Sequence, residues 1–222
     1  NHTTSFGGVV LTSGVSGDVN LPIELDEKFL TSSGRVSNVN ASSDQLTILF
    51  IAPEKMFNCE GAEVAAGEYV LQRYFLRKDD NSQNEKDYAL ACDANKPPAA
   101  TINAIVGMGE NSQIIMPRVD QLRFYLGTQN NNKKNLAYYT INKYKSEAKA
   151  LVDAKAKPPR IISIKVGVLV RSKDDTKSKL IDPTADVQFL EGEVGLINIT
   201  NKYLRQEYTT TIALRNAMGE PL

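Results

Sequence analysis

Histidine and tryptophan are almost absent from this sequence of 222 residues: there is no tryptophan, and the single histidine is His2. A metal site built on several histidines is therefore excluded, and a Ser-His-Asp triad would depend on a residue at a fraying chain end. No Walker motif occurs, and Gly107-Met108-Gly109 does not continue to GxGxxG. These absences argue against most hydrolases and metalloenzymes, and they favour a binding or structural module without a cofactor.

The sequence also lacks a net charge and a long hydrophobic run. Its 26 Lys and Arg balance 26 Asp and Glu, which excludes a globally basic nucleic-acid binder. The longest apolar run, Ile161 to Val170, contains Lys165 and is shorter than the roughly 20 residues that a membrane helix needs. No signal peptide is present, so any membrane anchor is expected upstream of Asn1. The 41% hydrophobic content supports a packed core.

There are only two cysteines, Cys59 and Cys92, and no CxxC pair that would indicate zinc or a redox dithiol. Two interpretations remain open. They are buried free thiols of a cytosolic protein, or they form a disulfide, which would stabilise the fold by roughly 3–4 kcal/mol. The Asn-, Ser-, Thr- and Gly-rich loops favour export to an oxidising compartment, and with it the disulfide.

What the sequence does contain is a series of β-branched and aromatic segments that predict strands. The predicted strands cover residues 45–51, 68–77, 87–92, 119–126, 160–171 and 203–214. One Ala- and Lys-rich segment, 145–157, predicts a helix that Pro158-Pro159 ends. Residues 1–44 predict irregular chain with short edge strands, and residues 173–204 predict a long excursion with weak strands.

No internal repeat or linker divides the chain, so the sequence predicts one globular domain over residues 1–222. Its expected fold class is α+β, with a mainly antiparallel β-sheet and a short inserted helix. Segments 68–77 and 87–92 are expected to be antiparallel neighbours. We expect the same of segments 160–171 and 203–214, because the long excursion between them permits return at a modest closure entropy.

Acidic pairs occur at Asp26-Glu27, Asp79-Asp80 and Asp174-Asp175. A glycosidase needs two carboxylates across a cleft, whereas adjacent acidic residues in polar runs are typical of solvated turns. The loop after Gly127 is neutral or basic, which argues against a calcium site. We therefore expect no catalytic residue and no bound metal.

One local charge cluster stands out between positions 133 and 165, where cations far outnumber the two anions, Glu147 and Asp153. The candidate basic surface contains Lys133, Lys134, Lys143, Lys145, Lys149, Lys155, Lys157 and Arg160. Tyr138, Tyr139 and Tyr144 are interleaved with it. Such a surface could bind single-stranded DNA, with rings stacking on bases and cations following phosphates. The alternatives are a solvated helix and loop, or a face complementary to an acidic partner subunit.

Several short motifs follow one another along the chain. They are Ser43-Asp44-Gln45-Leu46-Thr47, Asn58-Cys59, Arg73-Tyr74-Phe75, Leu90-Ala91-Cys92, Val119-Asp120-Gln121-Leu122 with Tyr125 and Gly127, the strand 164–172, and the stretch from Arg205 to Asn216. In this order they resemble the motifs of the PilW-type minor pilins of type IV pili. The resemblance covers about residues 43–216. The hydrophobic N-terminal helix of that family, with its processing site, is not in the sequence.

The resemblance implies a Cys59–Cys92 disulfide, because the two cysteines match the family's two-cysteine module. It also implies a structural, non-enzymatic role, as a minor pilin ectodomain that helps to initiate pilus assembly and caps the pilus tip in motility, adhesion and DNA uptake. The implied partners are other minor pilins, the major pilin and, through the N-terminal helix, the inner membrane. The implied location is the bacterial periplasm and inner membrane before assembly and the extracellular pilus afterwards. Two alternatives are a minor pseudopilin of type II secretion and a secreted carbohydrate- or surface-binding β-domain.

Overall fold

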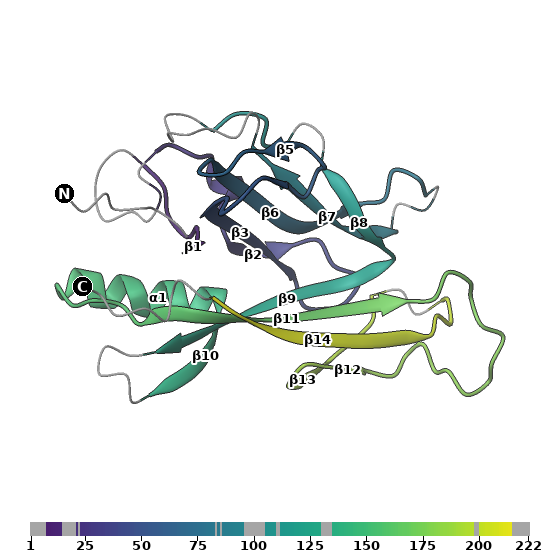
Figure 1. The fold of residues 1–222 in the computed structure, drawn as a ribbon. Helices are drawn as coiled ribbons and strands as arrows, with labels where there is room; N and C mark the ends of the chain where they lie inside the picture. The colour runs from purple at the N-terminus through teal and green to yellow at the C-terminus, as the bar shows by residue number, and fades with distance from the viewer. Residues whose placement is uncertain are drawn as a thin grey trace.

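The protein folds into two antiparallel sheets that lie one above the other, with one helix at one end (Figure 1). The structure is a computed structural model, which describes residues 8–14, 21, 23–82, 84, 86–95, 105–109, 112–129, 135–197 and 200–214. The predicted class, mainly antiparallel β with a short inserted helix, is confirmed.

The upper sheet in Figure 1 has six strands, in the order β1-β3-β6-β7-β8, with β2 also paired to β3. These strands are β1 (Gly8–Val9), β2 (Ser32–Arg35), β3 (Ser43–Ile51), β6 (Tyr69–Lys78), β7 (Tyr88–Ala94) and β8 (Gln113–Pro117). The prediction that the second and third of the predicted strands are antiparallel neighbours is confirmed, because β6 pairs with β7 and places Tyr74 opposite Cys92. The short strand β8 was not predicted.

The lower sheet has four strands, in the order β10-β9-β11-β14. These strands are β9 (Val119–Gln129), β10 (Leu136–Thr140), β11 (Arg160–Arg171) and β14 (Arg205–Ala213). Strands β11 and β14 pair antiparallel in one unbroken register, as predicted. The expected end of β9 at Gly127 is wrong, because Gly127 lies between Tyr138 of β10 and Ser163 of β11 and the ladder continues to Gln129.

Helix α1 (Ile141–Asp153) begins and ends four residues before the predicted range 145–157. It begins early because the Thr140 hydroxyl accepts a hydrogen bond from the Lys143 N–H at 3.3 Å and caps the first turn. It ends before Pro158 because Lys155 adopts a left-handed backbone with φ of 58°. Among the described residues, no helix is both long and apolar enough to span a bilayer.

The predicted excursion 173–204 contains a small hairpin that covers the outer face of the lower sheet. The remaining short elements are a 3-10 turn (Glu27–Phe29), β4 (Met56–Phe57), β5 (Glu63–Val64), β12 (Val187–Phe189) and β13 (Gly192–Val194). Phe189 and Val194 of the hairpin pack on Leu169 of β11. Leu190 approaches Gly167 so closely that a Cβ there would lie 2.7 Å from the leucine side chain. Glycine at position 167 therefore allows the hairpin to close on the sheet.

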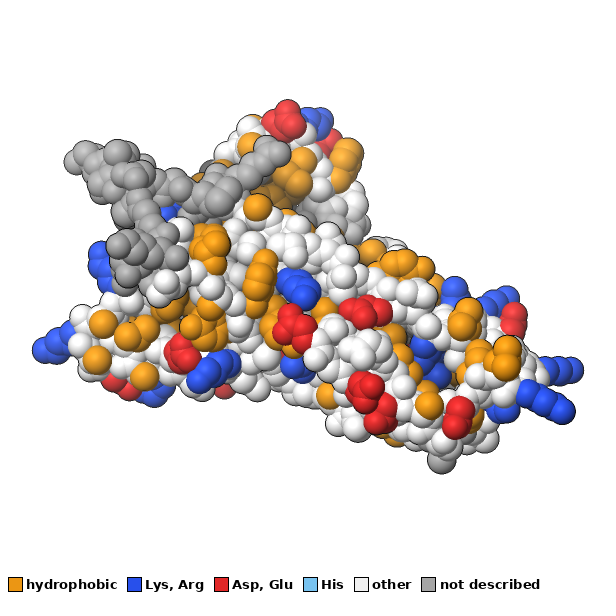
Figure 2. Space-filling model, turned by 90° about the horizontal axis from the view of Figure 1, so that it is seen from below, with side chains coloured by type: hydrophobic (Ala, Val, Ile, Leu, Met, Phe, Trp, Pro, Cys, Tyr) orange, Lys and Arg blue, Asp and Glu red, His pale blue; other side chains and the backbone are white. Residues whose placement is uncertain are grey.

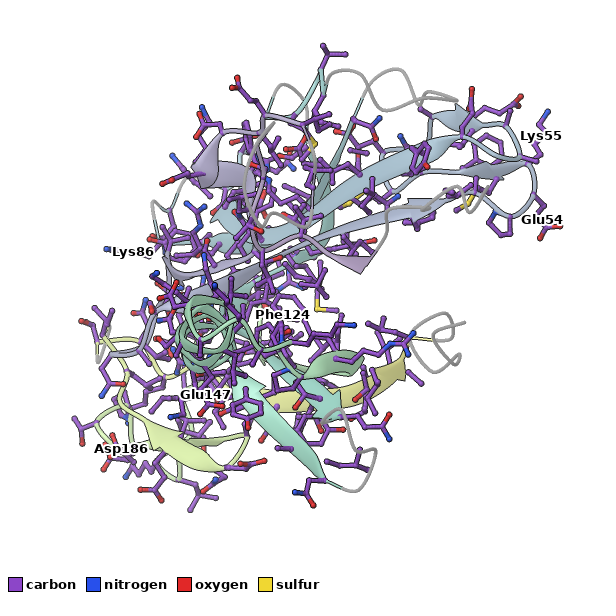
Figure 3. All side chains as sticks on the ribbon, turned by 90° about the vertical axis from the view of Figure 1, so that its left-hand side faces the viewer. Glu54, Lys55, Lys86, Phe124, Glu147 and Asp186 are labelled. Atoms are coloured by element: carbon purple, nitrogen blue, oxygen red, sulfur yellow. A yellow bond between two sulfur atoms is a disulfide. The ribbon has the colours of Figure 1, made fainter. Side chains whose placement is uncertain are left out.

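The main core fills the space between the two sheets, where Figure 3 shows Phe124. It combines Leu46 and Leu76 from the upper sheet with Leu122, Phe124, Leu126, Ile164 and Val168 from the lower one. Ile141 and Tyr144 of α1 close one end of this core. A single apolar cluster thus holds both sheets and the helix together.

We expect Val168→Asp to unfold the protein. Val168 is 9% exposed and packs in the main core, so the substitution would bury a carboxylate that has no partner, at a cost of several kcal/mol. Leu180→Asp is the matched control, because Leu180 is 94% exposed. Circular dichroism and urea unfolding of both variants measure the effect. Wild-type stability of Val168→Asp would contradict this placement of β11.

Candidate functional site

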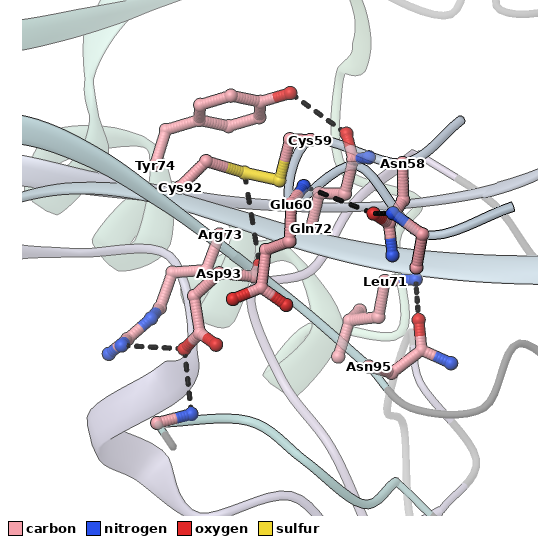
Figure 4. Close-up of a disulfide and its surroundings, with 12 residues drawn as sticks. Asn58, Cys59, Glu60, Leu71, Gln72, Arg73, Tyr74, Cys92, Asp93 and Asn95 are labelled. Carbon is pink, nitrogen blue, oxygen red and sulfur yellow. Dashed lines mark hydrogen bonds and ion pairs between the residues drawn. A yellow bond between two sulfur atoms is a disulfide. The ribbon is translucent and has the colours of Figure 1, made fainter. Parts of the chain in front are cut away.

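The structure joins Cys59 to Cys92, as the family resemblance implied. Cys92 is fully buried in β7, and Cys59 lies in the turn between β4 and β5 (Figure 4). The Asn58 side chain accepts hydrogen bonds from the N–H groups of Glu60 and Ala62, at 3.0 and 2.9 Å, and shapes that turn. The disulfide therefore holds the small β4–β5 hairpin against the upper sheet.

Next to the disulfide, Arg73 and Asp93 form a buried ion pair across β6 and β7, at 2.8 Å (Figure 4). The guanidinium lies over the rings of Phe29 and Phe75, at 4.7 and 3.7 Å from their centroids. Burial lowers the pKa of Arg73, and the charge of Asp93 opposes that shift. Asp93 also accepts the Gly109 N–H at 2.8 Å, so it fixes the segment that precedes β8.

Ser43 and Asp44 join the two sheets through side chain to backbone hydrogen bonds. The Ser43 hydroxyl accepts the Leu122 N–H at 3.2 Å, and the Asp44 carboxylate accepts the Phe124 N–H at 2.9 Å. Asp44 also lies 3.6 Å from the Arg123 guanidinium. Burial raises the pKa of Asp44, while Arg123 and the Phe124 N–H act in the opposite direction. The start of β3 is thereby attached to β9 of the other sheet.

A third carboxylate, that of Asp120 of β9, is fully buried and is surrounded by polar groups from several segments. Its Oδ2 atom accepts the Arg205 Nε–H at 2.7 Å, and its Oδ1 atom accepts the Asn38 side-chain amide at 2.9 Å. The Asp120 carbonyl accepts the backbone N–H of Asn38 at 2.9 Å and the Ser37 hydroxyl at 3.2 Å. Asp120 thus attaches β14 and the β2–β3 loop to β9.

The cluster extends to Arg171, the last residue of β11. Its Nε atom lies 3.5 Å from Asp120, and its terminal nitrogen forms an ion pair with Asp87 at the end of the β6–β7 loop. The Tyr203 ring lies against both guanidiniums, at 4.6 Å from Arg171 and 5.8 Å from Arg205. Two cations and two anions balance within the cluster, as buried charges require.

Sequence reasoning missed this cluster as a unit. Its members come from five separate segments, but one signal was available: Asp120 occupies the apolar face of a predicted strand with Leu122 and Phe124. A charged residue at such a position has to find a partner of opposite charge.

The candidate basic surface is only partly assembled. Lys143, Lys145 and Lys149 lie on α1, and Lys155, Lys157 and Arg160 follow in the segment that leads into β11. Lys133 and Lys134 lie outside the described residues. On the helix, Lys143 pairs with Glu147 at 3.0 Å and Lys149 with Asp153 at 2.9 Å. The hydrogen bond between Lys143 and Glu147 raises the pKa of the lysine and lowers that of the glutamate. The two anions of the segment therefore offset two of its cations.

The three tyrosines near this surface occupy different environments. Tyr138 is 51% exposed on β10. Tyr144 is buried and donates its hydroxyl to the Pro159 carbonyl at 2.8 Å, and burial raises its pKa to about 12. Tyr139 packs edge-on against Tyr144, with ring centroids 6.4 Å apart. Tyr138 is thus the most exposed of the three rings and the best placed to stack on a base.

Other charged residues on the surface make the positive charge of α1 less distinctive. Lys145 lines an open groove of about 840 Å³ whose other walls carry Glu24, Asp26 and Glu27. Exposed lysines also gather at the opposite end of the molecule, in the loop that contains Lys173, Lys177 and Lys179. Figure 2 shows blue side chains at both ends of the lower face, with red ones between them. The basic segment is therefore not the only place where exposed lysines gather in the described chain, although Asp174, Asp175 and Asp182 balance the three lysines of that loop.

Among the described residues, no group of three or more His, Cys, Asp or Glu side chains is arranged to hold a metal ion. The buried carboxylates Asp44, Asp93 and Asp120 are all used by arginines or by backbone N–H groups. These buried carboxylates therefore hold the strands of the two sheets in fixed positions.

We expect Asp120→Asn to cost about 3–5 kcal/mol of unfolding free energy, because the buried Arg205 guanidinium would lose its carboxylate partner and Arg171 would keep only that of Asp87. Asp80→Asn is the matched control. Asp80 pairs with Arg77 at 2.5 Å, but its side chain is 72% exposed, so the loss there should be about 1 kcal/mol or less. Urea unfolding of both variants provides the comparison, and equal losses would show that the Asp120 cluster does not stabilise the fold.

We also expect a pH-dependent contribution from Asp44. Because its folded pKa lies above the unfolded value of 3.8, the folded state binds the proton more tightly. The contribution of Asp44 to the free energy of unfolding is therefore largest below pH 3.8, and it is lost as the pH rises through the folded pKa. The difference in unfolding free energy between wild type and Asp44→Asn should fall with rising pH in this range and then stay constant.

Asp182 provides the control of opposite sign. The Thr184 hydroxyl and N–H donate to its carboxylate and lower its pKa, so its contribution should disappear as the pH falls. A difference between wild type and Asp44→Asn that does not vary with pH would contradict the burial of an ionisable Asp44.

Comparison with known proteins gives one match. A family model described as type IV pilus-assembly protein W, PilW, matches residues 73–216. No curated protein and no solved structure matches the chain.

The matched region begins at Arg73 and contains the Arg73–Asp93 pair, Asp120, Arg171 and Arg205. Ser43-Asp44 and Cys59 lie before it, although the resemblance extended to them. The family's matched region therefore includes the buried charges that fix the strands. Because it spans well over half of the sequence, the chain belongs to the PilW family of type IV pilus-assembly proteins.

Proposed function

We propose that this chain is the globular domain of a minor pilin that helps to initiate pilus assembly and caps the pilus tip. The observation that carries the proposal is that the region matched by the PilW family contains the buried ion pairs that fix strands within each sheet, Arg73–Asp93 and Arg205–Asp120, and the pair Arg171–Asp87 that joins the two sheets. Such a region supports a subunit whose work is done by its shape and surface. We accordingly propose a structural role without catalysis, for residues 1–222 as one domain.

The positions of β1 and β14, the first and last described strands, support a tip subunit. The start of β1, helix α1 and the end of β14 all lie at the same end of the molecule, on the left in Figure 1. A hydrophobic helix that precedes the domain would attach at that end and anchor it in the inner membrane before assembly. The loop with Lys173, Lys177 and Lys179 lies at the opposite end and would point away from the filament. Other minor pilins and the major pilin would be the partners, in the periplasm first and then on the extracellular pilus.

Deleting the gene should reduce the number of surface pili, and restoring the chain with an epitope after Leu180 should recover them. Leu180 is 94% exposed, so the insertion should leave the fold intact. Immunogold labelling should then mark one end of each pilus, whereas the same epitope on the major pilin should mark the whole shaft. Label along the shaft, or an unchanged number of pili in the deletion strain, would contradict the proposal.

The same strain separates the alternatives. A minor pseudopilin of type II secretion would leave the pili unchanged and reduce the amount of secreted protein. The family match favours the pilus interpretation over a secreted carbohydrate-binding domain. Binding of single-stranded DNA by the candidate basic surface stays a prediction. Exposed Tyr138 and the cations after α1 support it, and the ion pairs on the helix weaken it.

A further inference from the structure

Strand β14 forms one edge of the lower sheet and has a described partner on one side only, β11 (Figure 1). The bonds to β11 show which backbone groups remain. The Leu214 N–H donates to the Ile162 carbonyl, and the Leu204 carbonyl accepts the Ser172 N–H, both at 2.8 Å. Because the register is unbroken, even-numbered residues of β14 bond to β11 and odd-numbered residues direct their N–H and C=O groups outward.

This edge lacks the features with which proteins usually protect a free strand. β14 is nine residues long, with no proline and no bulge against β11. Its two charged residues are engaged elsewhere, since Arg205 bonds to Asp120 and Glu207 accepts the Leu190 N–H at 2.9 Å. From Tyr208 to Ala213 the strand carries no charge.

The other described sheet edges are different. β1 has two residues, whereas β8 and β10 have five each. β8 also ends in Pro117 and shifts register against β7 between Leu90 and Ala91. Among the sheet edges that the structure describes, β14 is thus the longest and the least protected.

The side chains of β14 are arranged symmetrically about Thr210. Tyr208 and Ile212, 61% and 52% exposed, are its large exposed hydrophobic residues, and each lies two positions from Thr210 on the same face. That face continues through Val168, Val166 and Ile164, which stand opposite them on β11. On the other face, Thr209 and Thr211 flank the same centre.

From this symmetry we propose that β14 binds β14 of a second copy of this chain, antiparallel, with a twofold axis at Thr210. Each Tyr208 then lies opposite Ile212 of the other copy, and each Thr209 lies opposite Thr211. Aromatic–β-branched and Thr–Thr pairs of this kind stabilise antiparallel strands. Glu207 faces Ala213, so its carboxylate opposes no like charge.

The backbone fits the same register. Residues 207, 209, 211 and 213 direct their hydrogen-bonding groups outward, and the twofold axis at Thr210 pairs these residues with one another. Each pair exchanges two backbone hydrogen bonds. The two four-stranded sheets become one continuous sheet of the dimer, and the exposed edge disappears. The inference is independent of the proposed function, because it depends only on this strand.

Cross-linking tests the register directly. Thr210→Cys should form a disulfide-linked dimer under mild oxidation, because the two Thr210 residues meet as a non-hydrogen-bonded pair with Cα atoms about 4.5 Å apart. Cys59 and Cys92 are already bonded to each other, so no native thiol competes. Thr209→Cys is the matched control on the opposite face, and it should cross-link at least tenfold more slowly.

Analytical ultracentrifugation of the chain over a range of concentrations tests the dimer itself. Thr210→Lys places two ammonium groups at the axis and should weaken dimerisation at least tenfold. Ala150→Lys adds the same charge on the exposed face of α1 and should leave it unchanged. A monomer at every concentration, equal cross-linking of the two cysteine variants, or a dimer insensitive to Thr210→Lys would each overturn the proposal. Capture of a strand from a different subunit by a monomeric chain would overturn it as well.

Discussion

The fold depends on one buried carboxylate, that of Asp120, and on the two arginines that compensate it. An unpaired carboxylate in this position would cost several kcal/mol, so Arg171 and Arg205 have to reach it. That requirement fixes the end of β11 against the start of β14. Through Asn38 and Asp87 it also fixes the β2–β3 and β6–β7 loops, which contact each other at one end of the upper sheet. The charge of Asp120 is therefore compensated only when these strands and loops are in their native arrangement.

The two edges of the lower sheet differ in how their outward-facing backbone groups are bonded. β10 pairs with β9 only from Tyr125 onward, which leaves the first half of β9 without a strand neighbour on that side. Ser43 and Asp44 of β3 accept the N–H groups of Leu122 and Phe124 there, so side chains replace the missing strand. β14 has no such cover in the described chain. At β14 the outward-facing backbone groups are therefore open to a strand of another chain.

The long strands were predictable because their β-branched residues are dense enough to exclude a helix, and the β11–β14 pairing followed from their length. The ends of the helix were not predictable from the sequence. Thr140 caps the helix and Ile141 is buried in the core, but both residues are β-branched and therefore look like strand residues in the sequence. A register shift before Ser163 turns Ile161 toward the main core, and strict alternation along 160–171 does not predict this. The Asp120 cluster was missed because Asn38 and Arg205 lie 82 and 85 positions from Asp120. The disulfide followed from the family resemblance and not from the cysteine spacing.

The disulfide limits how far the domain can be extended. Cys59 and Cys92 are 33 positions apart, yet their Cα atoms are separated by 6.1 Å. A fully extended segment of that size would span roughly 110 Å. Under tension applied at the two ends of the domain, the force passes across the sulfur bridge and this stored contour length is never released. The domain can therefore stretch far less before rupture than its number of residues suggests, and β6 and most of β7 stay inside the closed loop.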